Sequence, residues 1–130
     1  MALGPAVEHE DLRDREGHAK AILAAVEFRV DVARENDTVR ISPVGELDVA
    51  TIGTLRERVH EAMTAGRLIL DLRATTFVDS SALHLAVETY EWALQNGAEF
   101  AIIPAPPHVQ RTFDVAGLTS RLPFVDVPRT

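Results

Sequence analysis

The sequence of 130 residues contains no cysteine, which excludes disulfide bonds and thiolate metal ligands. It also lacks a long apolar run, because the longest, residues 21–26, is far shorter than the roughly 20 residues that cross a bilayer. Nothing at the N-terminus resembles an export signal. Positive charge is scarce: 13 basic against 20 acidic residues leave a net charge of −7, which repels nucleic acid and anionic membranes. We therefore expect a cytoplasmic protein that neither binds nucleic acid nor inserts into membranes.

The apolar content, in contrast, is sufficient for one folded domain. Hydrophobic residues make up 46% of the chain, and its length is that of a single domain with a real core. Residues 1–26 differ from the rest, since charged residues crowd ahead of a short apolar run. We expect them to form an arm, either disordered or a helix packed on the domain or on a second copy. In the last case the protein would be a homodimer. Residues 27–130 would form the domain.

The spacing of apolar residues predicts alternating strands and helices. The expected strands span residues 28–32, 39–44, 68–72 and 100–103, with an optional edge strand at 124–127. The expected helices span residues 52–63, 81–96 and 106–115, and the first two would end at left-handed caps on Gly66 and Gly97. The order β-β-α-β-α-β-α(-β) predicts an α/β domain with a mixed, mostly parallel sheet of four to five strands and amphipathic helices docked on it.

The junction before the second helix is the most informative part of the chain. Residues 78–85 read Val-Asp-Ser-Ser-Ala-Leu-His-Leu and join a buried-looking strand to that helix. A hydroxyl at a helix start lies at the positive end of the helix dipole, where backbone N–H groups favour a phosphate. Asp79 and Ser80 are also good N-caps, and a cap alone explains such a cluster in many helices. The residues alone leave both interpretations open.

Several segments, in order and spacing, resemble the STAS domain of bacterial anti-sigma factor antagonists. They are Gly45-Glu46-Leu47-Asp48, Leu68-Ile69-Leu70-Asp71-Leu72 and Phe77-Val78-Asp79-Ser80-Ser81. Residues 109–118 resemble the family's penultimate helix and its Gly-Leu end, so the likeness extends over about residues 27–127. The resemblance implies a single STAS-like domain.

The resemblance also implies a protein-binding function with no cofactor and no catalysis of its own. Such proteins sequester an anti-sigma factor that is also an ATP-dependent serine kinase of histidine-kinase-like ATPase fold, which frees a sigma factor for transcription. Phosphorylation of a serine ends the sequestration, and a serine phosphatase resets it. By resemblance the phosphorylated residue is Ser81, and the partner-binding residues are Asp48, Asp79, Ser80, Ser81 and Ala82. The family usually has glycine where this chain has Ala82.

Two interpretations are open for the helix that follows Ser81, and one of them is a second partner patch. Leu85 and Trp92 are seven residues apart and lie away from the apolar stripe of Leu83, Val87, Tyr90 and Leu94. An exposed leucine and tryptophan are typical anchors of a protein interface. The alternative is that the N-terminal arm covers them.

The alternatives to this function are an enzyme, an adaptor and a scaffold subunit. A small serine hydrolase or nucleotide-binding enzyme would rely on Ser81 with His84, but their spacing lacks the Gly-x-Ser-x-Gly elbow and a group to orient the imidazole. The histidines show no zinc-binding spacing, so no metal site is expected. A STAS-like adaptor of a lipid-transport assembly, or a scaffold subunit of a stress-sensing complex, would use the same fold without regulation through Ser81.

Overall fold

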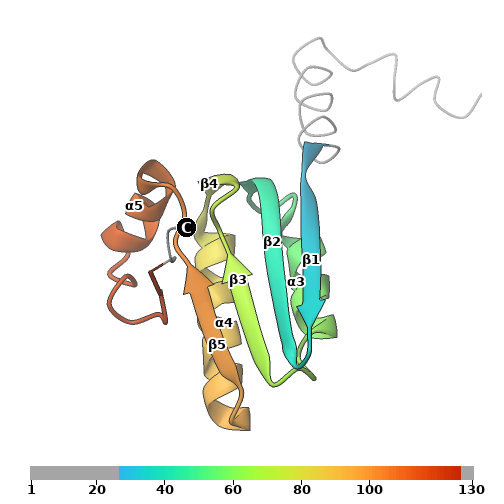
Figure 1. The fold of residues 1–130 in the computed structure, drawn as a ribbon. Coiled ribbons are helices and arrows are strands. Elements are labelled where there is room, and N and C mark those ends of the chain that lie inside the picture. Colours follow the sequence, from blue (N-terminus) through green and yellow to red (C-terminus); the bar gives the residue numbers. More distant parts are fainter. Residues whose placement is uncertain (1–26, 127–130) are drawn as a thin grey trace, which may run out of the picture.

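The computed structural model describes residues 27–126, so the expected arm lies outside the described part of the chain (Figure 1). The elements are β1 (Arg29–Glu35), β2 (Thr38–Leu47), α3 (Ile52–Glu61), β3 (Arg67–Asp71), β4 (Thr75–Val78), α4 (Ser80–Asn96), β5 (Glu99–Ile103) and α5 (Pro107–Val115). The sheet has the order β1-β2-β3-β5, with β4 paired to the far end of β2. β1 is antiparallel to β2 and the other pairings are parallel. The prediction of a mixed, mostly parallel α/β domain is confirmed.

Helices α3 and α4 cover one face of the sheet, and α5 lies at its side next to β4 and β5 (Figure 1). The strands turn alternate side chains toward the two helices. Val39 is paired with Leu68 and Ile41 with Leu70, and all four are buried. The core therefore lies between the sheet and the two helices. None of the described helices has the length and hydropathy that a membrane span requires.

Helix α3 ends differently from the prediction. Its C-cap is Ala62 in a right-handed conformation, and Gly66 does not have a positive φ. A Cβ at Gly66 would overlap the carboxylate of Asp37 in the hairpin turn. A larger residue would displace only the exposed Asp37 side chain, and the right-handed cap at Ala62 shows that the predicted left-handed cap at Gly66 is wrong.

Helix α4 ends as predicted. Gly97 is its C-cap with a left-handed φ of 67°, and its N–H donates to the Ala93 carbonyl. Leu94, however, is 66% exposed, although its spacing placed it on the apolar stripe. The stripe thus loses contact with the domain before the helix ends.

The secondary patch predicted on α4 is wrong for Leu85. The buried face of this helix is centred on small residues, namely Ala82, Ala86, Thr89 and Ala93. Small residues bring a helix close to its sheet, so larger side chains on both flanks are buried, Leu83 on one and Leu85 on the other. Leu85 is only 3% exposed and belongs to the core, whereas Trp92 is half-buried. The two do not form a surface patch.

The C-terminal region is largely as expected. Helix α5 begins with a proline and buries Val109 and Phe113. The optional edge strand is only a single parallel bridge between Ile102 and Phe124, while Val127 lies outside the described residues. The fifth strand of the sheet is β4, which was not among the predicted strands.

Candidate functional site

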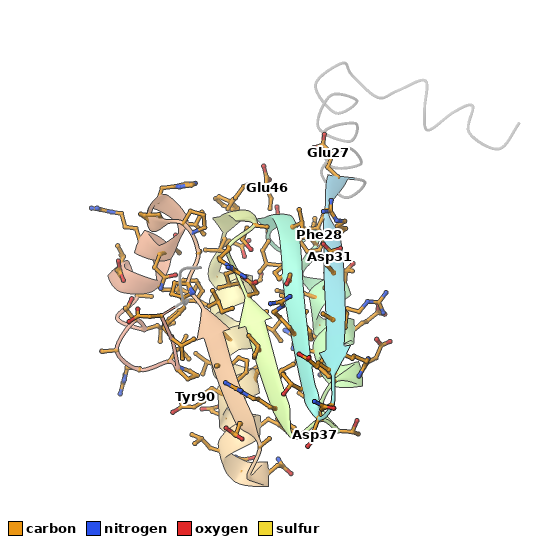
Figure 2. All side chains as sticks on the ribbon, viewed as in Figure 1. Glu27, Phe28, Asp31, Asp37, Glu46 and Tyr90 are labelled. Carbon is orange, nitrogen blue, oxygen red and sulfur yellow. The ribbon has the colours of Figure 1, made fainter. Side chains whose placement is uncertain are left out.

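The parallel strands β2 and β4 end side by side. Leu47 is paired with Val78, and the Asp79 N–H donates to the Leu47 carbonyl over 3.2 Å. The residue after each strand is an aspartate, Asp48 after β2 and Asp79 after β4. Figure 2 shows this end of the domain, marked by Glu46 on β2, opposite the end that carries Asp37. Parallel pairing therefore brings together the two aspartates and the start of α4.

Asp79 is the N-cap of α4, as predicted. Its Oδ1 accepts a hydrogen bond from the Ser81 N–H at 2.8 Å, and its Oδ2 accepts one from the Val49 N–H at 3.2 Å. One carboxylate thus ties the helix start to the loop after β2. Ser80 is the first helical residue and is exposed, so the prediction that it shares the capping role is wrong.

Asp48 stabilises the turn that leads into α3. Its Oδ1 accepts hydrogen bonds from the N–H groups of Ala50 at 2.9 Å and Thr51 at 3.2 Å. Thr51, the N-cap residue, is 2% exposed and donates its hydroxyl to the Glu46 carbonyl at 2.8 Å. Asp48 therefore holds the turn before α3, whose N-cap is Thr51. Its contribution to a partner surface stays a prediction.

Ser81 is the second residue of α4 and is half-buried. Its N–H is occupied by Asp79, while its hydroxyl has no hydrogen-bond partner among residues 27–126. The side chain of Ala82 points the other way: it is 5% exposed and packs in the core. A partner could therefore contact Ala82 only through its backbone, and that contact stays a prediction. For the same reason, the methyl group that replaces the family's usual glycine does not obstruct the surface around Ser81.

Two exposed apolar residues lie at the same end of the domain as the serines, and neither was predicted as part of the site. Val49 is 78% exposed and its N–H is the one bonded to Asp79. Phe77, on β4, is 48% exposed and is paired with Glu46. The signal for Phe77 was available, because its strand neighbour Val78 is apolar and successive strand residues point to opposite faces. Both residues add exposed apolar surface to the end of the domain where β2 and β4 end.

A third aspartate, Asp71, ends β3 and is 6% exposed. Burial alone would raise the pKa of the Asp71 carboxyl, but hydrogen bonds from Arg73 and its positive charge outweigh burial and lower the pKa. The shortest contact joins Arg73 Nη2 to Asp71 Oδ2 at 2.7 Å, and the Arg73 N–H also donates to Oδ1 at 3.1 Å. This pair stabilises the connection from β3 to β4.

The groups that a hydrolase would need are not assembled around Ser81. His84 is exposed, and no hydrogen bond joins it to Ser81 in the part of the chain that the structure describes. The same hundred residues, 27–126, contain no group of three or more His, Asp or Glu side chains arranged to hold a metal ion.

The mixed sheet, the helices on one face and the capped serine pair together define a small α/β domain of the type the sequence resembles. The chain belongs to the STAS domain family, whose model matches residues 29–128. The anti-sigma F factor antagonist of Paenibacillus polymyxa is 34% identical over 91 residues, which cover 68% of this chain and 76% of the relative. The anti-sigma-B factor antagonist of Bacillus subtilis (strain 168) is 26% identical over 92 residues, with coverage of 70% and 84%.

The fold agrees with solved structures as well. The crystal structure of an anti-sigma factor antagonist from Mycobacterium paratuberculosis matches with a TM-score of 0.67 at 25% identity, covering 75% of this chain and 84% of that one. The resemblance stated from the sequence is confirmed. These three relatives are anti-sigma factor antagonists, and none of them is named as an enzyme.

Proposed function

We propose that this protein is itself an anti-sigma factor antagonist that acts as a phosphorylation-controlled binding module in the cytoplasm. Without phosphate it binds an anti-sigma factor that is also a serine kinase of histidine-kinase-like ATPase fold. Phosphorylation of Ser81 by that kinase releases the partner, and a serine phosphatase restores binding. ATP belongs to the kinase, so this chain needs no cofactor. Family membership and the two curated relatives support the general role.

The position of Ser81 is the observation that carries the phosphorylation switch. The residue lies in the first turn of α4 with its side chain half-exposed and its hydroxyl unbonded within residues 27–126. A phosphate adds about −1.5 to −2 charges. At a helix start, backbone N–H groups and the helix dipole tolerate that charge. The folded domain should therefore accept the modification without unfolding.

The same phosphate would be costly within an interface. A partner that covers this end of the domain, where Val49 and Phe77 are exposed, would also remove water from the start of α4. A phosphate on Ser81 would then lose its hydration and lie near the carboxylates of Asp48 and Asp79. Desolvation and like-charge repulsion both lower the affinity. Release then follows from added charge at a preformed surface.

The experiment is a pull-down from the native host's lysate with four baits: wild type, Ser81→Ala, Ser81→Asp and Ser120→Asp. Ser120 is exposed in the turn after α5, so it gives the same charge change away from α4. We expect every bait except Ser81→Asp to retain a histidine-kinase-like ATPase, identified by mass spectrometry. If Ser81→Asp retains it as well as wild type does, the switch is disproved. If all four baits retain transporter subunits or homologous scaffold proteins instead, the sigma-factor role is disproved.

A further inference from the structure

A groove of about 430 Å³ separates the start of α4 from α5. Ser80 and Leu83 line it from α4, and His108, Arg111, Thr112 and Val115 line it from α5. The α5 residues recur at helical spacing and so form one face of that helix. Different residues, Val109 and Phe113, attach α5 to the core. The groove face of α5 is therefore not used in packing the domain.

The groove is partly apolar, and its apolar part is open. Val115 is 79% exposed, slightly more than any other large hydrophobic residue among those described. Leu83, which is 8% exposed, is the buried apolar residue across from it. A highly exposed valine beside an open groove can bury its side chain only against another molecule. Because Ser80 lines the groove, this apolar surface is continuous with the start of α4.

The charge of the groove is opposite to that of the whole protein. Arg111 makes no ion pair with any described residue, and no acidic side chain lines the groove. Asp79 nearby is already bonded to two backbone N–H groups, and Asp114 on α5 is bonded to the Thr119 hydroxyl. A protein with a net charge of −7 thus offers an unpaired cation beside its switch serine. A carboxylate would be repelled by most of the surface and attracted here.

We propose that this groove receives an acidic, amphipathic segment of the anti-sigma factor. An apolar side chain of that segment would pack against Val115 and Leu83, and a carboxylate would pair with Arg111. The inference rests on the proposed function, since it names a second contact of the same partner. It also connects the groove to the proposed phosphorylation switch, because Ser81 directly follows Ser80, which lines the groove. A phosphate on Ser81 would place negative charge at the groove and repel the bound carboxylate.

The test uses the ATPase recovered with wild type, purified and titrated onto variants of the full chain. Arg111→Glu should weaken binding by roughly tenfold or more, and Arg111→Lys should restore most of it, because charge at this position carries the contact. Val115→Asp should weaken binding similarly. The matched controls are Arg34→Glu, near the distant hairpin turn, and Leu94→Asp, at the other end of α4; both positions are exposed, and both variants should bind like wild type.

Salt dependence gives a second readout that general loss of structure would not mimic. Raising the ionic strength should weaken the binding of wild type more than that of Arg111→Glu. Salt screens the pair of Arg111 with the partner's carboxylate, and the variant lacks this pair. Far-UV circular dichroism identifies any variant that fails to fold. If Val115→Asp does not fold, the affinities of wild type, Arg111→Lys and Arg111→Glu alone decide whether the groove contact exists. If Arg111→Glu binds like wild type while Ser81→Asp does not, the groove contact is disproved and the proposed function stands. If wild type recovers no ATPase at all, both proposals fall.

Discussion

Replacing Asp79 with alanine should destabilise the domain by about 2 kcal/mol. The loss of an N-cap side chain costs about 1 kcal/mol, and here the lost bond is the one from the Ser81 N–H at 2.8 Å. The Val49 N–H also loses its acceptor, but Val49 is 78% exposed and water can replace the bond, so this part costs about 0.5 kcal/mol. Removing a negative charge from the helix start adds about 0.5 kcal/mol.

Asp79→Asn separates these contributions, because the amide keeps one oxygen that can accept from the Ser81 N–H, while its NH2 group cannot accept from the Val49 N–H. Asparagine and aspartate are similarly good N-caps, so this variant should lose only the charge and the Val49 bond, about 1 kcal/mol. Urea unfolding can be followed by the fluorescence of Trp92, the only tryptophan, which lies on α4 itself. With a slope of about 2 kcal/mol per molar urea, the midpoint should fall by about 1 M for alanine and about 0.5 M for asparagine.

Two outcomes would refute this reasoning. Equal midpoints for Asp79→Ala and Asp79→Asn would show that the hydrogen bond from the Ser81 N–H does not stabilise the start of α4. A midpoint for Asp79→Ala equal to that of wild type would show that neither the charge nor the hydrogen bonds contribute, and the rigid surface inferred around Ser81 would lose its basis.

The remaining predictions concern a buried charge and two glycines. The pKa of Asp71 is lowered in the folded protein, so its carboxylate contributes stability above the pKa of the unfolded chain, and this contribution is lost as the pH falls below about 4, through the folded pKa. Arg73→Ala should raise the pKa of Asp71, since burial is then less opposed; an unchanged carboxyl titration by NMR would contradict the pairing. Gly97→Ala should cost about 1 kcal/mol because the residue is left-handed, whereas Gly53→Ala, exposed in α3 with open space around it, should stabilise by up to about 1 kcal/mol. Equal shifts of the two urea midpoints would be inconsistent with these backbone conformations.

The comparison of two glycines shows which parts of the fold could be predicted. Gly66 and Gly97 both follow an amphipathic helix, and the sequence alone treats them alike. Gly97 caps its helix through a local hydrogen bond to Ala93, which local sequence can indicate. Gly66 instead lies close to the side chain of Asp37, a residue far away in the chain. Patterns of local origin were therefore predictable, and contacts between distant segments were not.

The same distinction explains the errors at the candidate site. The cap at Asp79 is local and was predicted, whereas the burial of Leu85 depends on how closely α4 approaches the sheet. The prediction assumed that the buried face is where the largest residues lie. In the structure it is centred on Ala86 and Thr89, so residues on both flanks are buried. The position of Phe77 next to Glu46, by contrast, depends on the pairing of β4 with β2, which the sequence pattern did not indicate.

The contacts around Ser81 favour a switch that acts by charge more than by shape. Asp79 binds the N–H groups of both Val49 and Ser81, so the loop after β2 and the start of α4 are held as one unit. Since the carboxylates of Asp48 and Asp79 are already engaged by backbone N–H groups, the surface between them is preformed in the unmodified protein. A partner can bind such a surface without ordering it first, which limits the entropic cost of association. A phosphate on Ser81 then needs only to make that surface too negative to be covered, and the domain beneath it can stay as it is.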